Sequence, residues 1–212
     1  MTRPSVSLLD AFVPTFCISC KAVGSLFCES CRAEIKLNLH PVERGGFLGW
    51  STHNLDSYLG NLILAFKERG KTALSSYLAN LAIPALETFR ERPFNLVALP
   101  TSRAAFARRG FDANRVLAKA VAKRTGLTLN DSVLRLSRQP GDQRGLSSDQ
   151  RVQNLSGSMV ARKGRGRVLL VDDVVTTGAS VLEGRRALLE AGFEVAGFIT
   201  IAETLLQKSP KN

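Results

Sequence analysis

Hydrophobic residues in the second half of the chain gather into short runs, and amphipathic stretches separate these runs. The runs at residues 95–100, 167–171 and 195–201 have the length and apolar composition of buried strands. Residues 112–125 and 179–191 repeat apolar positions at helical spacing, and a glycine follows each stretch. Strands separated by helices predict a parallel sheet with right-handed crossovers, so we expect an α/β fold.

Three further segments show a regular pattern. Residues 58–69 place apolar side chains on one helical face and are followed by Gly70, which is typical of a helix end. A second helix is predicted over residues 74–89, and residues 132–136 alternate as in a strand. The predicted domain is therefore a parallel sheet with helices flanking it.

All four cysteines lie within fifteen residues, in the pattern C-x2-C-x7-C-x2-C formed by Cys17, Cys20, Cys28 and Cys31. Two C-x-x-C pairs put four thiolates within reach of one tetrahedral Zn²⁺, and four Cys ligands leave no position open for water. We therefore expect a small four-cysteine module with structural zinc. Two disulfides or a redox C-x-x-C are the alternatives. A reducing cytoplasm disfavours disulfides, and no strand precedes either pair as in thioredoxin-like motifs.

A linker is predicted between this module and the α/β domain. Residues 39–49 contain Pro41 and three glycines, and the helical pattern stops there. We expect a zinc-binding module with its linker at residues 1–50 and the α/β domain at residues 51–212. His53, close to this boundary, is interpreted as a surface or linker histidine.

The composition is that of an ordinary globular protein, because 44% of the residues are hydrophobic and 22% are charged. No apolar run approaches the roughly 18 residues that a membrane helix requires. Asp10 and Pro14 interrupt the apolar stretch at the N-terminus, unlike in a signal peptide. We therefore expect a soluble, cytoplasmic protein without membrane insertion.

Positive charge is concentrated in one part of the chain. The formal net charge is +11, and residues 90–167 alone carry 17 Lys or Arg against five Asp or Glu, a balance of +12. Such a field suits polyanions, either nucleic acid or a small molecule with several phosphates. A solvated basic surface is the alternative. Only 7% of the residues are aromatic, which disfavours base stacking but not contacts with a nucleic-acid backbone.

The segment most informative about chemistry is Val168 to Ser180, which reads V-L-L-V-D-D-V-V-T-T-G-A-S. An apolar strand ends in the adjacent carboxylates of Asp172 and Asp173, and a turn rich in Thr and Gly then opens a helix. Open α/β sheets bind ligands at the carboxyl ends of their strands, and a helix N-terminus favours a phosphate. Gly178 lets the backbone approach that phosphate. The carboxylates can accept hydrogen bonds from the hydroxyls of a ribose 5-phosphate.

This segment resembles the signature with which type I phosphoribosyltransferases bind 5-phosphoribosyl-1-pyrophosphate (PRPP). The resemblance implies that Asp172 and Asp173 hold the ribose hydroxyls. The implied 5-phosphate loop comprises Thr176, Thr177, Gly178, Ala179 and Ser180. The alternatives are a strand that ends in acidic residues by chance, a Walker-B-like strand and a receiver-domain acidic pocket. None of them has the T-T-G-A-S loop, and no P-loop accompanies this one.

Several shorter motifs accompany this signature. They are the four cysteines, Leu99-Pro100-Thr101-Ser102-Arg103, Arg109-Gly110-Phe111, and the spaced set Gln143, Leu146, Ser147, Arg151 and Asn154. Together they resemble the ComF family of competence-associated phosphoribosyltransferase-like proteins over nearly the whole chain. Asp112-Ala113 departs from that family, where Asn-Gln usually follows Arg-Gly-Phe. Gln150 is a second departure, since an acidic residue often stands there.

The resemblance also implies how PRPP would be held and used. Thr101, Ser102 and Arg103 correspond to the loop that binds pyrophosphate with Mg²⁺, and Arg109 is a further candidate. An ordinary strand–helix loop with a solvent-facing arginine is the alternative. In an enzyme, an acceptor would attack C1 of the ribose while pyrophosphate leaves. The catalytic candidates are then Arg103 and the two aspartates of the signature, and the chain has no convincing general base.

Residues 137–158 form a long polar segment with few apolar residues. A long polar loop inside a compact domain is usually functional or disordered. In the resembled fold this segment is a mobile hood that excludes water from the reacting centre. Arg144 and Arg151 would then meet the leaving pyrophosphate, with plain disorder as the alternative.

Two classes of function follow from these observations. The first is a phosphoribosyltransferase that acts on a base-like acceptor, linked to DNA uptake and competence or to nucleobase metabolism. The second is a non-catalytic competence protein that binds PRPP or single-stranded DNA and meets partner proteins of DNA uptake. The acceptor cannot be read from the sequence.

Overall fold

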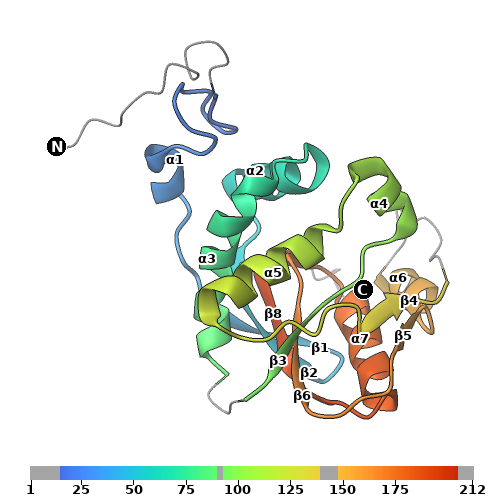
Figure 1. The fold of residues 1–212 in the computed structure, drawn as a ribbon. Coiled ribbons are helices and arrows are strands. Elements are labelled where there is room, and N and C mark those ends of the chain that lie inside the picture. Colours follow the sequence, from blue (N-terminus) through green and yellow to red (C-terminus); the bar gives the residue numbers. More distant parts are fainter. Residues whose placement is uncertain (1–14, 90–92, 139–147, 205–212) are drawn as a thin grey trace, which may run out of the picture.

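The structure is a computed structural model that describes residues 15–89, 93–138 and 148–204. Its helices and strands are labelled in Figure 1. In chain order they are α1 (Glu29–Ala33), β1 (His40–Arg44), β2 (Phe47–Asn54), α2 (Ser57–Glu68), the 3₁₀ helix η2 (Thr72–Leu74), α3 (Ser75–Glu87), β3 (Asn95–Ala98), α4 (Arg103–Arg109), α5 (Ala113–Thr125), β4 (Leu134–Leu136), α6 (Ser148–Leu155), β5 (Met159–Ala161), β6 (Arg167–Val171), β7 (Val174–Val175), α7 (Ala179–Glu190) and β8 (Glu194–Glu203).

A mainly parallel sheet forms the centre of the molecule, which confirms the predicted α/β fold class. Its strand order is β1-β2-β8-β6-β3, with the short β7 beside β8. Among the described strands of this sheet, only the β1–β2 pair is antiparallel. The strand predicted at residues 132–136 exists as β4, but it pairs with β5 in a separate two-stranded sheet.

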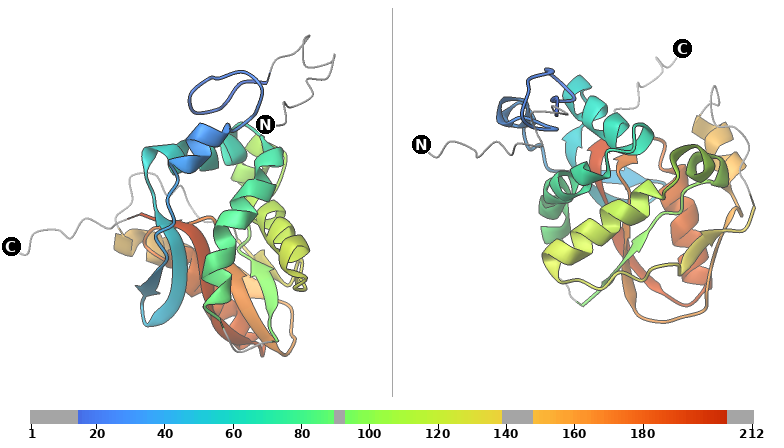
Figure 2. Two further views of the ribbon diagram at one scale, coloured as in Figure 1. Left: turned by 90° about the vertical axis from the view of Figure 1, so that its left-hand side faces the viewer. Right: turned by 45° about the horizontal axis from the view of Figure 1, so that its top comes forward.

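Helices cover both faces of this sheet. On one face, α2, α3 and α5 pack against the strands in the larger of two apolar clusters. On the other face, α7 and the β4–β5 pair enclose the second cluster. Figures 1 and 2 show the sheet between these layers, with α2 and α4 above it. The four apolar residues of β6 are at most 1% exposed because they are covered from both sides.

The segment that we expected to be a linker belongs to the sheet instead. Residues 40–54 form the β1–β2 hairpin, and β2 continues the parallel sheet by pairing with β8, where Trp50 lies opposite Ile199. Gly45 and Gly46 occupy the two turn positions with φ of 55° and 70°. Two consecutive positive φ angles are what a two-residue hairpin turn requires, so these glycines mark a turn rather than a linker.

His53 is buried rather than exposed, which corrects the sequence-based expectation. It lies on β2 at 4% exposure, and its Nδ1 is 2.8 Å from Thr52 Oγ1 and 3.2 Å from the Ile201 carbonyl oxygen. Burial lowers its pKa, so the imidazole stays neutral at pH 7. His53 is therefore a hydrogen-bonded core residue between two strands.

The predicted helices have the caps that their sequence indicates. Asp112 caps α5 by accepting a hydrogen bond from the Arg115 N–H, and Gly126 ends the helix in the left-handed region. In α3, Pro84 lies inside the helix. The short helix α4 is not among the elements that the pattern predicts. Among the helices that the structure describes, none has the length and apolarity needed to cross a membrane.

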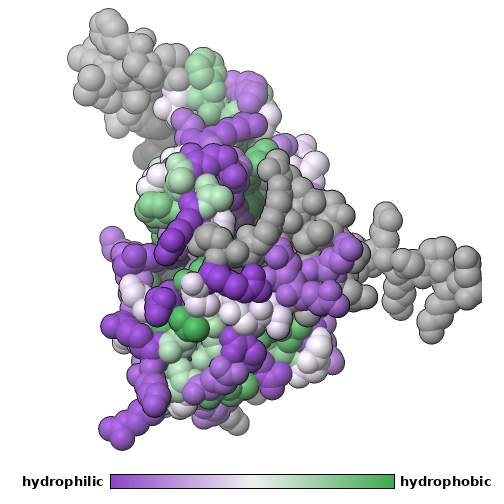
Figure 3. Space-filling view, turned by 90° about the vertical axis from the view of Figure 1, so that its right-hand side faces the viewer, coloured by the Kyte–Doolittle hydropathy of each residue, from purple (hydrophilic) through white to green (hydrophobic). Residues whose placement is uncertain are grey.

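Hydrophilic side chains predominate on the face of the molecule that carries α4, α6 and α7. Figure 3 views this face, where apolar side chains appear as smaller areas among polar ones. The larger apolar clusters lie inside the molecule, between the sheet and its helices.

Candidate functional site

A cavity of about 310 Å³ opens where β3 and β6 end. Parallel strands end at the same edge of a sheet, so residues that follow different strands meet there. The cavity wall consists of Lys67, Leu99, Pro100, Thr101, Ser102, Ala105, Arg109, Asn114, Asp172, Asp173, Val174, Thr176 and Ser180. The structure thus brings the Thr101–Ser102 loop, the acidic pair and part of the predicted phosphate loop together around one cavity, which we call the central cavity.

The loop after β3 is fixed by two helix caps. Ser102 caps α4 by accepting a hydrogen bond from the Ala105 N–H at 3.2 Å. The Thr101 hydroxyl donates to Asp112 Oδ1 at 2.8 Å, and Asp112 in turn caps α5. The aspartate that departs from the ComF pattern therefore has a structural role, because it ties the loop to α5.

The two adjacent aspartates lie in different environments. Asp173 is 1% exposed; its Oδ1 accepts the Val174 N–H at 2.7 Å, and its Oδ2 lies 2.7 Å from Lys67 Nζ. Asp172 is half-buried, and its Oδ1 accepts hydrogen bonds from the Asp173 N–H and from Asn114 Nδ2. Burial, together with the neighbouring Asp173 charge, raises the pKa of Asp172 to about 7. Asp172 is therefore the carboxyl group of the pair that is better placed to meet a ligand.

Asn114 is a cavity residue that sequence reasoning missed. Its Nδ2 donates to Asp172 Oδ1 at 2.8 Å and to the Leu99 carbonyl oxygen at 3.2 Å. Since both partners are acceptors, they fix the orientation of the amide. Its Oδ1 is buried and has no hydrogen-bond partner within the described parts of the chain. A buried acceptor without a partner is costly, which favours a ligand donor at this point of the wall.

The predicted phosphate loop lies at the N-terminus of α7 and lines a smaller cavity of about 40 Å³. Gly178 is the N-cap residue with φ of 82°, and a Cβ atom there would lie 2.5 Å from Arg44 Cβ. Glycine is therefore required both by the backbone conformation and by the close approach of Arg44. This differs from our sequence-based reason, which was the approach of the phosphate itself.

Arg44 is a second residue that sequence reasoning missed, because it comes from the hairpin expected to be a linker. Its Nε donates to the Thr176 carbonyl oxygen at 2.8 Å, and its Nη2 forms an ion pair of 2.5 Å with Glu203. Glu203 also lies 2.8 Å from His40 Nε2. Arg44 thus links the β1–β2 hairpin and the end of β8 to the predicted phosphate loop.

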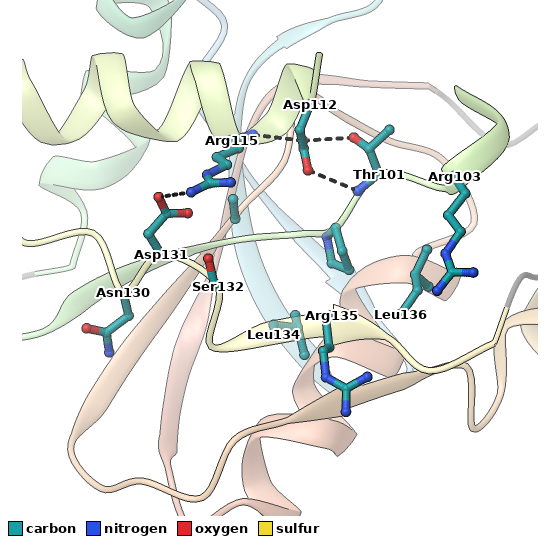
Figure 4. Close-up of a pocket in the computed structure, with 12 residues that line it drawn as sticks. Thr101, Arg103, Asp112, Arg115, Asn130, Asp131, Ser132, Leu134, Arg135 and Leu136 are labelled. Atoms are coloured by element: carbon teal, nitrogen blue, oxygen red, sulfur yellow. Dashed lines mark hydrogen bonds and ion pairs between the residues drawn. The ribbon is translucent and has the colours of Figure 1, made fainter. Parts of the chain in front are cut away.

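The arginines predicted to bind pyrophosphate lie in different places. Arg109 reaches the central cavity, where its guanidinium contacts Glu68 at 2.5 Å. Arg103 lines a second cavity of about 300 Å³ on the other side of the Thr101 loop. Figure 4 shows Arg103 across that cavity from the Arg115–Asp131 ion pair. The structure therefore does not bring Arg103 into the wall of the central cavity.

The two arginines predicted for a lid are only partly described. Arg144 lies outside the described residues. Arg151 belongs to α6, a helix at Ser148–Leu155 within the segment that we expected to be a long polar loop. Leu155 at the end of this helix lines the smaller cavity beside the phosphate loop, so this segment does lie next to the predicted site.

The four cysteines form one cluster that could hold a metal ion such as zinc. Their Sγ atoms all lie within 4.8 Å of one another, and Cys20 and Cys28 Sγ are 3.5 Å apart. Tetrahedral Zn–S bonds of about 2.3 Å imply S–S separations of roughly 3.8 Å, so the donor set fits zinc. Burial opposes ionisation of Cys17, but backbone amides around it outweigh that effect and lower the pKa of its thiol to about 6.

The parallel sheet and the position of the central cavity are typical of α/β proteins that bind phosphorylated ligands at strand ends. A model of the phosphoribosyl transferase domain family matches residues 105–212, roughly half of the chain. The chain therefore belongs to this family. A comparison with curated proteins found no match.

Three solved structures are among those that the chain resembles at low sequence identity. Orotate phosphoribosyltransferase from Aeropyrum pernix has 17% identity and a TM-score of 0.40, over 82% of this chain and 90% of that one. Adenine phosphoribosyltransferase from Saccharomyces cerevisiae has 17% identity and a TM-score of 0.39, over 83% and 89%. UMP synthase from Leishmania donovani has 18% identity and a TM-score of 0.39, over 68% of this chain and 24% of the synthase. The family assignment rests on the family model, because each TM-score is below 0.5.

Proposed function

We propose that this protein binds PRPP with Mg²⁺ in the central cavity and transfers its phosphoribosyl group to an acceptor. The observation that carries the proposal is the juxtaposition of the Thr101–Ser102 loop, Asp172 and two residues of the predicted phosphate loop, Thr176 and Ser180, around one cavity. In this arrangement the first N–H groups of α7 hold the 5-phosphate. Asp172 accepts hydrogen bonds from the ribose hydroxyls, and the loop after β3 meets the pyrophosphate.

The residues in the wall also fit the metal. Mg²⁺ prefers oxygen ligands and is usually held by one or two carboxylates together with substrate phosphates, and Asp172 supplies such a carboxylate. When bound, Mg²⁺ neutralises charge that develops on the departing pyrophosphate. In the transfer itself, the bond between C1 and the pyrophosphate oxygen breaks, and pyrophosphate keeps the electron pair. An acceptor atom forms the new bond to C1, and its proton passes to water or to the departing pyrophosphate.

We propose the ComF family as the finer assignment. It is supported by the run of motifs in the sequence and by their places in the structure. In the Arg109-Gly110-Phe111 motif, Arg109 contacts Glu68, Gly110 ends α4 with φ of 78°, and the Phe111 ring packs on Phe66 at 6.0 Å. This motif therefore joins α4 to α2 at the rim of the central cavity. A structural zinc in the cysteine cluster belongs to the same proposal.

Pyrophosphate release from PRPP, measured with Mg²⁺ across a panel of nucleobases, tests the proposal. We expect release that depends on one class of base and that Asp172→Asn abolishes, with Asp131→Asn, which lies outside the wall of the central cavity, as a matched control. PRPP binding without release for any base would select the non-catalytic alternative, a PRPP-binding competence protein. The site assignment fails if PRPP binds equally well to the unmodified protein and to Asp172→Asn.

A further inference from the structure

Lys67 belongs to none of the sequence motifs, yet it stands in the wall of the central cavity. It lies in the last turn of α2, and its ammonium is 2.7 Å from Asp173 Oδ2. The Lys67 side chain is 25% exposed, whereas the Asp173 side chain is 2% exposed. The Lys67 side chain therefore extends from α2 to the cavity wall, where the buried Asp173 carboxylate holds its ammonium group.

The ammonium of Lys67 has hydrogen-bonding capacity beyond this ion pair. A lysine ammonium has three N–H donors, more than the ion pair with Asp173 can occupy. Asp173 cannot turn away readily, because its other oxygen accepts the Val174 N–H at 2.7 Å. Burial opposes the charge on Lys67, but the charges of Asp173 and Asp172 outweigh it and raise the pKa of the lysine. A fixed positive charge thus faces the cavity at neutral pH.

The surroundings of Lys67 indicate which part of a ligand it meets. Arg109 is its neighbour in the cavity wall, and the same wall contains Thr101 and Ser102. In the proposed function, the backbone N–H groups of α7 hold the 5-phosphate, so that group needs no lysine. Both cations are ion-paired, but Asp173, which binds Lys67, belongs to the cavity wall, whereas Glu68, which binds Arg109, does not. Arg103 lines the other cavity. The ammonium of Lys67 is therefore held at the cavity wall, where it can meet the diphosphate of the ligand.

We propose that Lys67, positioned by the buried Asp173, binds the diphosphate end of PRPP. This proposal rests on the proposed function and assigns different roles to the two adjacent aspartates. Asp172 serves the ribose, whereas Asp173 acts as a positioning residue through Lys67. A lysine on α2 thereby contributes to a site that is otherwise built from the ends of β3 and β6.

Calorimetric titration of Lys67→Gln with PRPP, inorganic pyrophosphate and ribose 5-phosphate, each with Mg²⁺, tests this. Because a charge-assisted hydrogen bond would be lost, we expect PRPP and pyrophosphate to bind about 10- to 100-fold more weakly. Ribose 5-phosphate should bind as it does to the unmodified protein. Lys71→Gln, at an exposed position just after α2, is the matched control and should change neither affinity. Lys67→Arg keeps the charge and should restore part of the PRPP affinity.

Asp173→Asn separates positioning from direct binding. We expect it to weaken PRPP and pyrophosphate in the same selective way as Lys67→Gln. The proposal is overturned if either variant weakens ribose 5-phosphate as much as PRPP, because Lys67 would then only neutralise a buried carboxylate. Failure of the unmodified protein to bind either PRPP or ribose 5-phosphate would instead refute the proposed function. Circular dichroism and thermal unfolding of both variants establish that they fold.

Discussion

Two neighbouring aspartates in one motif lie in different surroundings, and this difference underlies the different tasks that we propose for them. Asp173 is 1% exposed and both of its oxygens are engaged, one by a backbone N–H and one by Lys67. Asp172 keeps access to the central cavity, and burial raises its pKa to about 7. At this scale the binding chemistry depends on which oxygen is already occupied, and the motif alone does not contain that information.

The raised pKa of Asp172 predicts a pH-dependent gain in stability on neutralising it. A carboxyl group whose folded-state pKa lies above its ordinary value stabilises the fold at low pH, and this contribution is lost as the pH rises through about 7. Asp172→Asn should therefore raise the thermal unfolding midpoint by roughly a few degrees at pH 8, and much less at pH 5. Differential scanning calorimetry at both pH values measures this.

Asp131 provides a control whose pKa is shifted in the opposite direction. Its pKa is lowered because the ion pair with Arg115 outweighs the desolvation of its carboxylate. Asp131→Asn should leave the unfolding midpoint unchanged or slightly lower at pH 8. An equal midpoint for Asp172→Asn and the unmodified protein at pH 8 would contradict the assigned environment of Asp172.

Cavity residues that belong to a contiguous sequence motif could be predicted from the sequence. Cavity residues and their neighbours that lie outside such a motif could not. The signature at residues 168–180 is contiguous, so strand, acidic pair and glycine loop appear together in one run of letters. Lys67, Asn114 and Arg44 each come from a different element, and only the folded chain brings them to the same cavity region. Nothing in the spacing of these three residues indicates that they meet.

At the scale of elements, the periodicity of apolar residues predicted most helices and strands, whereas Pro and Gly did not distinguish a hairpin turn from a linker. The helices α2, α5 and α7 and the strands β3, β6 and β8 could be predicted because their apolar pattern reflects the face that they bury. The β1–β2 hairpin was mistaken for a linker because Pro and Gly mark tight turns as well as loops. Its partner β8 is about 150 residues away in sequence, as in the pair Trp50–Ile199, so no local signal identifies the pairing.

The β1–β2 hairpin contacts the predicted phosphate loop through Arg44, and a substitution can remove this contact. Arg44→Ala deletes the hydrogen bond to the Thr176 carbonyl oxygen and the ion pair with Glu203. We expect about a tenfold loss in affinity for ribose 5-phosphate and an equal loss for PRPP, because only the phosphate they share is affected. Isothermal titration with both ligands measures the two ratios.

Arg185→Ala is the comparison for this prediction. Arg185 stacks 4.8 Å over the Phe47 ring and makes no described contact with the phosphate loop. It should leave both affinities unchanged. If Arg44→Ala weakens PRPP but not ribose 5-phosphate, then Arg44 acts on another part of the ligand.

At the scale of the whole molecule, the cysteine cluster is joined to the domain through packing. Cys17, Phe27 and Cys31 belong to the same apolar cluster as α2 and α3, and the Phe27 ring packs edge-on against Tyr77 at 5.2 Å. Arg32 also lies 5.3 Å from the centre of the Tyr77 ring. Metal binding in this cluster should therefore stabilise the contact between the N-terminal segment and α3.

We predict about one zinc per chain and its loss in Cys28→Ser, since structural zinc contributes folding free energy of roughly 10 kcal/mol or more. Metal analysis of protein purified under reducing conditions measures the content. Hydrogen exchange should rise in residues 15–33 and change little in β6 and β8. Ser30→Ala, an exposed position between the last two cysteines, is the control and should retain the metal. A metal-free unmodified protein would contradict the prediction.

The position of β8 in the sheet has a consequence for the order of folding. It is the last strand of the described chain, yet it lies between β2 and β6 and joins the two halves of the sheet. During synthesis, the β1–β2 hairpin and the β3–β6 pair therefore emerge without the strand that connects them. Pairing across such long sequence separations is slow, and unpaired strand edges promote aggregation in the meantime. We therefore expect this protein to complete its sheet only after β8 has left the ribosome, and to depend on chaperones during that interval.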